Sequence, residues 1–320
     1  MSKKSGLKQI EIIFQAFFLI LAAAILMLVV VLASSRKKEL ISPQVRKGMQ
    51  RVGDIGSRRA SVILTGDVML GRTVMTKSID LFDSAYPFRK VADTLNRADI
   101  VFINLENPII TDCPLSFEGF KFCASPGMVD GLVFGGVDIV NLANNHSRNY
   151  GDEGLQETIK ILNENNIEAT GLGELVKMQV GEVEFGFLGF DFTISEPKEE
   201  DYDFIDFTAT EVDVLIVGVH WGIEYTQNPT NAQKEWAEKM IFSGADILVG
   251  HGPHWVQEIE LIEGKPVYYS LGNFVFDQMW SEETKKGLVV RLTFEGDEIV
   301  KEERLPIYMS SWAQPEFVGE

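Results

Sequence analysis

The segment Ile247-Leu248-Val249-Gly250-His251-Gly252-Pro253-His254 joins a short apolar run to two histidines three positions apart. The chain contains four histidines, and the other two, His146 and His220, also follow short apolar runs. Apolar runs that alternate with helices are typical of the strands of α/β folds, whose ligands bind beyond the carboxyl ends of the strands. Histidines confined to such ends predict a metal or acid–base site there.

The same alternation of short β-prone runs and amphipathic stretches continues outward from this segment and begins at Ala60. It predicts strands at 61–64, 100–103, 138–140, 212–219, 246–249, 267–269 and 288–294, a hairpin at 176–193, and helices at about 86–97, 152–165 and 230–243. Asp152 and Glu153 suit a helix N-terminus because acidic side chains interact favourably with its dipole. The pattern predicts one α/β domain, 60–320, with a mixed sheet or two packed sheets.

Residues with metal-ligand chemistry follow five of these strands. They are Asp67, Glu106, Asn145, His146, His220, His251 and His254. Carboxylates, amide oxygens and imidazoles bind divalent Zn, Mn or Fe, and this set is too large for one tetrahedral ion. It fits two ions bridged by one carboxylate. Taken singly, each residue has an ordinary structural explanation as a turn, cap or hydrogen-bonded polar residue.

The N-terminal part of the chain differs in composition from the rest. After a tail of residues 1–11, positions 12–33 are almost wholly apolar and long enough to span a bilayer as a helix. A signal anchor is favoured over a cleaved signal peptide, whose apolar region is shorter, and over a buried core helix. Residues 34–59 are a basic linker, which is a solvated spacer or a segment that lies on anionic headgroups.

Charge and cysteines bear on partners and compartment. Residues 60–320 contain 18 basic and 44 acidic residues, which argues against nucleic acid as a partner. Cys113 and Cys123 are ten positions apart and are either a disulfide, as suits a domain outside the cytosol, or two free thiols. Basic residues flank the apolar segment on both sides, so charge alone does not orient it. The expected location is the cell membrane, single-pass, with the main domain extracytoplasmic.

Seven stretches resemble the CapA family of poly-gamma-glutamate capsule biosynthesis proteins, in order over about 60–315. They are Gly66-Asp67-Val68-Met69-Leu70-Gly71-Arg72, Asn104-Leu105-Glu106, Asn141-Leu142-Ala143-Asn144-Asn145-His146, Asp152-Glu153-Gly154, His220-Trp221-Gly222-Ile223-Glu224-Tyr225, Gly250-His251-Gly252-Pro253-His254-Trp255-Val256-Gln257 and Tyr269-Ser270-Leu271-Gly272-Asn273-Phe274-Val275-Phe276-Asp277-Gln278. That family is similar to calcineurin-like metallophosphoesterases. The resemblance implies an α/β fold, a β-sandwich of mixed sheets flanked by helices, with a two-metal centre.

The resemblance also implies residue roles. Asp67 would bind one metal and Glu106 would bridge, Asn145 and His220 would bind the second metal, and His251 and His254 would complete the sites. His146 would act as an acid or an oxyanion donor. Substrate-binding or supporting positions are Arg72, Asn104, Glu224, Asn273 and Asp277.

Two departures from the superfamily pattern affect these expectations. Met69 stands where most metallophosphoesterases have a metal-binding histidine, so the site of His254 is expected to be empty or weak. The segment 189–213 looks short, as if a helix were missing.

Three functions follow from these features. The first is a membrane-anchored hydrolase with one or two Mn, Zn or Fe ions, acting on a phosphoester or a glutamyl amide. The second is a non-catalytic accessory subunit of a polymer synthase or export complex, which binds an anionic polymer. The third and weakest is a purely structural membrane partner, because the clustering of all four histidines at strand ends argues against it.

Overall fold

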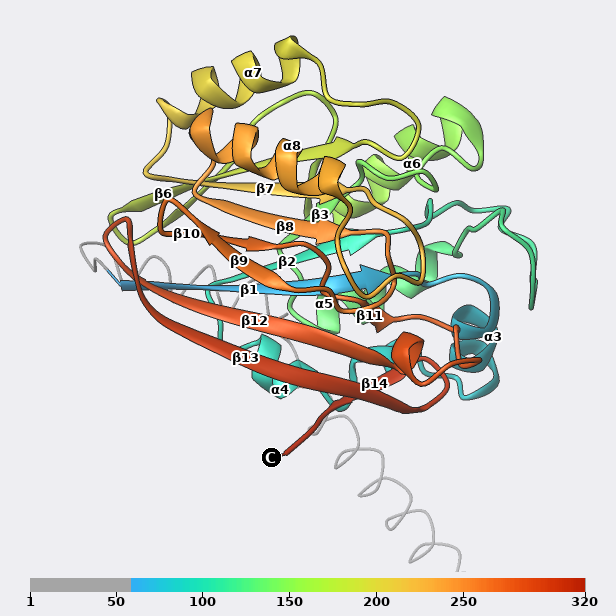
Figure 1. Ribbon diagram of the computed structural model, residues 1–320. Coiled ribbons are helices and arrows are strands. Elements are labelled where there is room, and N and C mark those ends of the chain that lie inside the picture. The colour runs from blue at the N-terminus through green and yellow to red at the C-terminus, as the bar shows by residue number, and fades with distance from the viewer. Residues whose placement is uncertain (1–58, 320) are drawn as a thin grey trace, which may run out of the picture. The chain divides into compact units, whose positions relative to one another are not determined.

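The structure is a computed structural model, and it describes residues 59–319 (Figure 1). The predicted tail, membrane segment and linker up to residue 58 lie outside the described residues. Among the residues described, no helix is both long and apolar enough to cross a membrane.

Two mixed sheets form the centre of the domain. Across the first, the described strands run β14 (Gln314–Phe317), β13 (Glu298–Ser311), β12 (Lys286–Glu295), β1 (Arg59–Val68), β2 (Ile100–Leu105), β3 (Ile139–Asn141) and β4 (Glu168–Thr170), and β11 (Asn273–Val275) also pairs with β1. The second runs β5 (Val176–Val180), β6 (Val183–Asp191), β7 (Val214–His220), β8 (Ile247–His251), β10 (Lys265–Tyr268) and β9 (Ile259–Ile262). Strands β1 to β4 are parallel to one another, as are β6, β7, β8 and β10.

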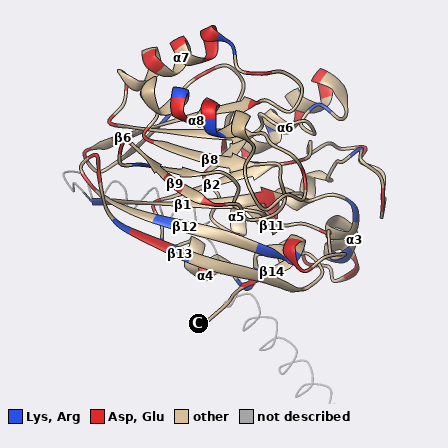
Figure 2. Ribbon diagram, in the orientation of Figure 1, with Lys and Arg blue, Asp and Glu red and all other residues tan. Residues whose placement is uncertain are grey.

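Helices cover the outer faces of both sheets. They are α3 (Arg72–Asp80), α4 (Ala92–Leu95), α5 (Val129–Phe134), α6 (Gly151–Glu164), α7 (Glu199–Ala209) and α8 (Asn231–Phe242), with short 3-10 turns η1 (Tyr86–Phe88), η2 (Pro126–Met128) and η3 (Glu283–Lys285). Figure 1 shows α7 and α8 over the sheet that contains β7 and β8. Figure 2 shows acidic residues concentrated along α7.

The central strands β1, β2, β3, β7 and β8 are buried on both faces along nearly their whole length, which explains their nearly continuous apolar runs. Successive side chains of β1 point to opposite faces, so Val62 and Leu64 enter the core between the sheets and Ile63 enters the core under the helices. Phe102 of β2 stacks on Phe187 of β6, with ring centroids 5.7 Å apart. The inner core therefore holds the two sheets face to face.

Strand β1 changes neighbours where the site begins. Up to Leu64 it pairs with β12, and from Asp67 it pairs with β11. Between these, Gly66 lies so close to the facing chain that a Cβ would stand 1.9 Å from the carbonyl oxygen of Gly272. Only glycine permits this approach, and it brings the carboxyl end of β1 beside β11.

The structure confirms the α/β fold of two mixed sheets flanked by helices and corrects several elements. The helix predicted at 86–97 is broken into η1 and α4, and the hairpin at 176–193 is β5 and β6. The expectation of a missing helix in 189–213 was wrong, because the acidic segment forms α7 and buries Tyr202, Ile205 and Thr208 at spacings of three. The long strand β13 was not predicted.

Candidate metal centre

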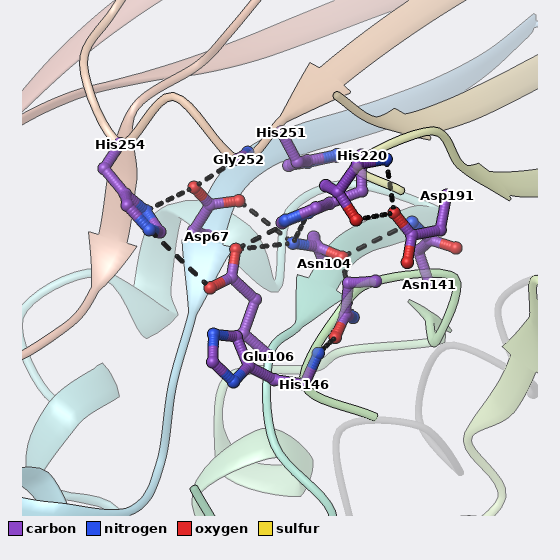
Figure 3. A network of polar contacts seen from close by, with 12 residues as sticks. Asp67, Asn104, Glu106, Asn141, His146, Asp191, His220, His251, Gly252 and His254 are labelled. Atoms are coloured by element: carbon purple, nitrogen blue, oxygen red, sulfur yellow. Dashed lines mark hydrogen bonds and ion pairs between the residues drawn. The ribbon is translucent and has the colours of Figure 1, made fainter. Parts of the chain in front are cut away.

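Polar side chains form two rows at the carboxyl edges of the two sheets (Figure 3). The first row, from neighbouring strands, is Asn273, Asp67, Asn104 and Asn141. The second row is Asp191, His220 and His251. Because the sheets stack face to face, the rows face each other, and the strand-end rule used on the sequence holds.

Asp67, Glu106 and His254 make up the tightest group in the described part of the chain. Their candidate ligand atoms all lie within 4.8 Å of one another, and all three side chains are buried. His254 Nδ1 is 3.0 Å from Asp67 Oδ2, and its Nε2 is 4.0 Å from Glu106 Oε2. His254 has a left-handed backbone with φ of +59°, which costs a non-glycine residue about 1 kcal/mol or more.

Asn104 connects the carboxylates. Its Nδ2 lies 3.0 Å from Asp67 Oδ1, 3.0 Å from Glu106 Oε1 and 3.3 Å from His220 Nδ1. One amide nitrogen has two hydrogens, so three acceptors share two donors. The amide orientation is fixed because Asn104 Oδ1 accepts hydrogen bonds from Asn141 and Asn144.

The buried histidines are fixed in tautomer by their partners. His251 donates from Nε2 to the backbone carbonyl of Thr65 at 3.0 Å, so its Nδ1 carries the lone pair, and this atom has no hydrogen-bond partner among the described residues. His220 Nδ1 lies 3.7 Å from Glu106 Oε1. A second hydrogen bond that orients a ligating imidazole is typical of metal sites.

The pKa values of the two buried carboxylates are shifted in opposite directions. Burial would raise the pKa of Asp67, but its hydrogen bond with His254 and the charge of that residue outweigh this and hold the pKa well below its usual range. Burial and the charge of Asp67 raise the pKa of Glu106 well above its usual range. Burial lowers the pKa of His220 to about 3 and also lowers the pKa of His251. Both imidazoles are therefore neutral, which is the form that binds metals.

His146 lies beside this group but outside its hydrogen bonds. Its ring stacks on Phe122 with centroids 4.0 Å apart, and its Nδ1 is 3.1 Å from Asn149 Oδ1. The imidazole is half-buried, and burial lowers its pKa. Figure 3 shows its ring next to Glu106. A neutral imidazole at the edge of the buried group suits acid–base chemistry.

Other expected site residues divide into supporting and exposed positions. The guanidinium of Arg72 binds both carboxylate oxygens of Asp277 and donates to the backbone carbonyl of Gly119, so its fork is already occupied. Asn273 donates to Gln278 Oε1 at 3.1 Å and to the backbone carbonyl of Thr284. Both pairs support the site wall.

Asn145 and Glu224 are exposed. The buried amide at this strand end is instead Asn144, whose Oδ1 accepts from the backbone nitrogens of His146 and Ser147. The role expected for Asn145 stays a prediction. Glu224 acts on the site through its charge, which adds to the rise in the pKa of Glu106.

Met69 does not present its sulfur to the carboxylates. Its Sδ accepts the backbone N–H of Gly71 at 3.0 Å, and the side chain is buried in the core under the helices. The position is thus a packing position in this chain.

Three residues of the two rows and their surroundings were not among the expected site residues. Asn141 and Asn144 lay inside a quoted motif, and Asp191 ends β6 and is aligned with His220. The rule that polar residues follow apolar strands would have found Asp191. A cavity of about 520 Å³ opens beside Asn144 and Asp191, between α6 and α7.

Cys113 and Cys123 form a disulfide, with Cα atoms 5.7 Å apart. It closes a segment without helix or strand whose side chains are mostly exposed, including Leu115, Phe117 and Phe120.

The buried group fits a divalent cation. Asp67 and Glu106 are both fully buried, which is costly for adjacent carboxylates without a compensating charge. Within the described part of the chain, Glu106 Oε2 and His251 Nδ1 have no hydrogen-bond partner. Oxygen and imidazole donors with unused lone pairs are the ligand set of Zn, Mn or Fe.

Comparison with known proteins identifies the family. The family model described as "Bacterial capsule synthesis protein PGA_cap" matches residues 61–204 and 203–278. The chain belongs to this family. It is 30% identical over 262 residues to "Capsule biosynthesis protein CapA" of Bacillus anthracis, covering 73% of this chain and 64% of that protein. It is 29% identical over 253 residues to "PGA biosynthesis protein CapA" of Bacillus subtilis (strain 168), covering 72% and 66%. The matches thus span slightly less than two thirds of the length of these relatives.

A solved structure shares the fold. A hypothetical protein from Thermus thermophilus aligns with a TM-score of 0.51 and 17% identity, covering 77% of this chain and 98% of that one. The likeness concerns the arrangement of sheets and helices.

Proposed function

We propose that this chain is a metal-dependent hydrolase of capsule or poly-gamma-glutamate biosynthesis. The observation that supports this most is the fully buried Asp67–Glu106–His254 group, in which one Glu106 oxygen has no partner among the described residues. Relatives whose names assign them to capsule and PGA biosynthesis support the biological setting.

The metal would be held by Asp67, Glu106 and His254, with His251 Nδ1 and His220 as further donors. When bound, such an ion lowers the pKa of water and polarises a phosphoryl or carbonyl oxygen. The chain's own residues contribute orientation and proton handling. Asn104 fixes the carboxylates through two hydrogen bonds of 3.0 Å.

His146 would exchange the proton of the reaction at Nε2. Its Nδ1–H donates to Asn149, which leaves Nε2 of the neutral ring as the free nitrogen. The substrate class is a phosphoester or a glutamyl amide. The cavity of about 520 Å³ next to Asn144 and Asp191 offers room for part of it.

The test combines metal content with activity. The full-length chain is purified, analysed for Mn, Zn and Fe, and assayed on para-nitrophenyl phosphate and γ-glutamyl-para-nitroanilide. His146→Ala should lose hydrolysis and keep its metal, whereas Asn165→Ala, a half-buried polar change at the end of α6, should keep both. A chain that binds none of the three metals would refute the hydrolase.

A second candidate is an accessory subunit that binds and guides an anionic polymer in a synthesis or export complex. Two observations favour it: Met69 is packed into the core, and Asn145 is exposed. Bound metal without hydrolysis of either substrate would support this function.

We also propose the arrangement in the cell. Residues 12–33 would anchor the chain in the cell membrane by one helix, 34–59 would form the linker, and 60–320 would work outside the cytosol. The disulfide between Cys113 and Cys123 supports an oxidising compartment.

A further inference from the structure

The segment closed by the disulfide reaches His146 of the candidate site through the ring of Phe122. Residues 113–121 are mostly exposed and have no regular secondary structure, whereas Phe122 and Cys123 are buried. The segment therefore ends in an aromatic side chain that is inserted into the domain.

Phe122 forms the surface on which His146 lies. The two rings are nearly parallel, with an interplanar angle of 25° and centroids 4.0 Å apart. Of the four histidines, His146 is the least buried, and its ring is hydrogen-bonded to Asn149 and not to Asp67 or Glu106. Its position thus depends on this stack and on the bond to Asn149, and not on the buried carboxylates.

Asn149 links the ring to the disulfide-closed segment. Its Oδ1 lies 3.1 Å from His146 Nδ1 and accepts the backbone N–H of Phe122 at 2.6 Å. One carbonyl oxygen therefore fixes both members of the stack. A displacement of the Phe122 backbone would remove one partner of Asn149 and the support of the imidazole together.

Arg72, the first residue of α3, contacts the same segment. Its guanidinium carbon lies 4.5 Å from the Phe122 ring centroid, and its Nη1 donates to the Gly119 carbonyl at 2.8 Å. Arg72 is itself fixed by Asp277. This residue pair therefore stabilises the segment instead of offering a free cation to the substrate.

We propose that Phe122, Asn149 and Arg72 are positioning residues for His146, and that the Cys113–Cys123 disulfide keeps them in place. Reduction would free residues 113–121 from their closed loop and let Phe122 leave the imidazole. The site would then respond to the redox state of its surroundings through the orientation of His146. The consequence for catalysis rests on the proposed hydrolase function; the structural consequence does not.

The test observes His146 directly. Selective 13C labelling of the full-length chain gives one Cε1–H signal for each of the four histidines, and the His146 signal is identified by its loss in His146→Gln. A proton above an aromatic face is shifted upfield, so loss of the stack moves its signal downfield. Treatment with a phosphine reductant, Cys113→Ser/Cys123→Ser and Phe122→Leu should each move the His146 signal downfield and leave the other three in place.

Matched variants separate positioning from general damage. Phe120→Leu changes an exposed ring of the same segment and should leave all four signals unchanged, and Phe122→Tyr should retain the stacked shift. An unmoved His146 signal after reduction would overturn the proposal. Movement of all four signals would overturn it too, because the disulfide would then support the whole site. If hydrolysis is found, Phe122→Leu should lower kcat more than it changes KM.

These spectra do not depend on turnover. A chain without hydrolytic activity that shows the selective shift keeps the positioning inference and loses the proposed function. An active chain without the shift keeps the proposed function and loses the positioning inference.

Discussion

Replacing Glu106 by Gln tests the metal centre through stability. The substitution keeps the shape of a fully buried side chain and removes its charge. Without metal, Glu106→Gln should be at least as stable as the wild type, because burial and the charge of Asp67 already raise the pKa of Glu106 and oppose its ionised form.

Bound metal should make the wild type more stable than Glu106→Gln. A ligand at about 100 times its Kd stabilises by about 2.7 kcal/mol. At roughly 2–4 °C per kcal/mol for a domain of this size, the wild-type Tm should rise by roughly 5–11 °C. Supporting residues of metal sites contribute about 10–100-fold in affinity, and Glu106 itself should contribute at least the upper value. At the same metal concentration, a variant weakened 100-fold gains only about 0.4 kcal/mol, or about 1 °C.

The assay is thermal unfolding of the full-length chain with chelator and with added Mn, Zn or Fe. Asp138→Asn is the matched control, since it removes the charge of another buried acid, at the opposite end of β3, that accepts the Val101 N–H at 2.9 Å. Its metal-induced rise should equal that of the wild type. The reasoning fails if Glu106→Gln responds to metal as the wild type does.

Two further predictions concern the backbone at Gly66 and the side chain of Tyr225, whose ring centroid lies 5.8 Å from that of His254. Gly66→Ala places a Cβ at 1.9 Å from a backbone oxygen and should lower the free energy of urea unfolding by about 3 kcal/mol or more. Gly127→Ala adds a Cβ in open space and should change this free energy by under about 1 kcal/mol. Equal effects of the two substitutions would contradict the close approach at Gly66. Burial, and then the charge of Glu224, raises the pKa of Tyr225 to about 12. Because the unfolded chain ionises this phenol near pH 10, its contribution to stability is complete below pH 10 and is lost as the pH rises towards 12. An absorbance titration should show that Tyr225→Phe removes a phenol that ionises near pH 12, and loss of a phenol near pH 10 would contradict the burial.

The sequence predicted the strand ends well because their chemistry is local. A buried strand must be apolar on both faces, so a charged or imidazole side chain at its end is conspicuous, as with Asp67 near the end of β1 and His220 at the end of β7. The resemblance marked Asn104 as a substrate-binding or supporting position, but the sequence could not show that its amide joins residues from three other chain segments. That role depends on register between strands, which no single stretch encodes.

Elements of mixed composition were missed for a related reason. Strand β13 is exposed and charged in its first half, and only later residues such as Ile307 and Met309 are buried, so no alternation marks it as a strand. Helix α7 buries three residues under a strongly acidic surface, and the acidic run hides the spacing. In both, pairing with a neighbouring element supplies the stability that the local pattern does not show.

The position of His254 changes the expectation drawn from Met69. From the sequence, the methionine suggested that the metal site of His254 would be the weaker one. In the structure, His254 lies 3.0 Å from Asp67 and is the histidine grouped with both buried carboxylates. It keeps a left-handed backbone that glycine would adopt without cost. A residue with only a packing role gives no reason to retain that strain, whereas a ligand does. Met69 meanwhile satisfies the Gly71 N–H with its sulfur. The compact group that could hold a metal ion is therefore Asp67, Glu106 and His254, without a contribution from Met69.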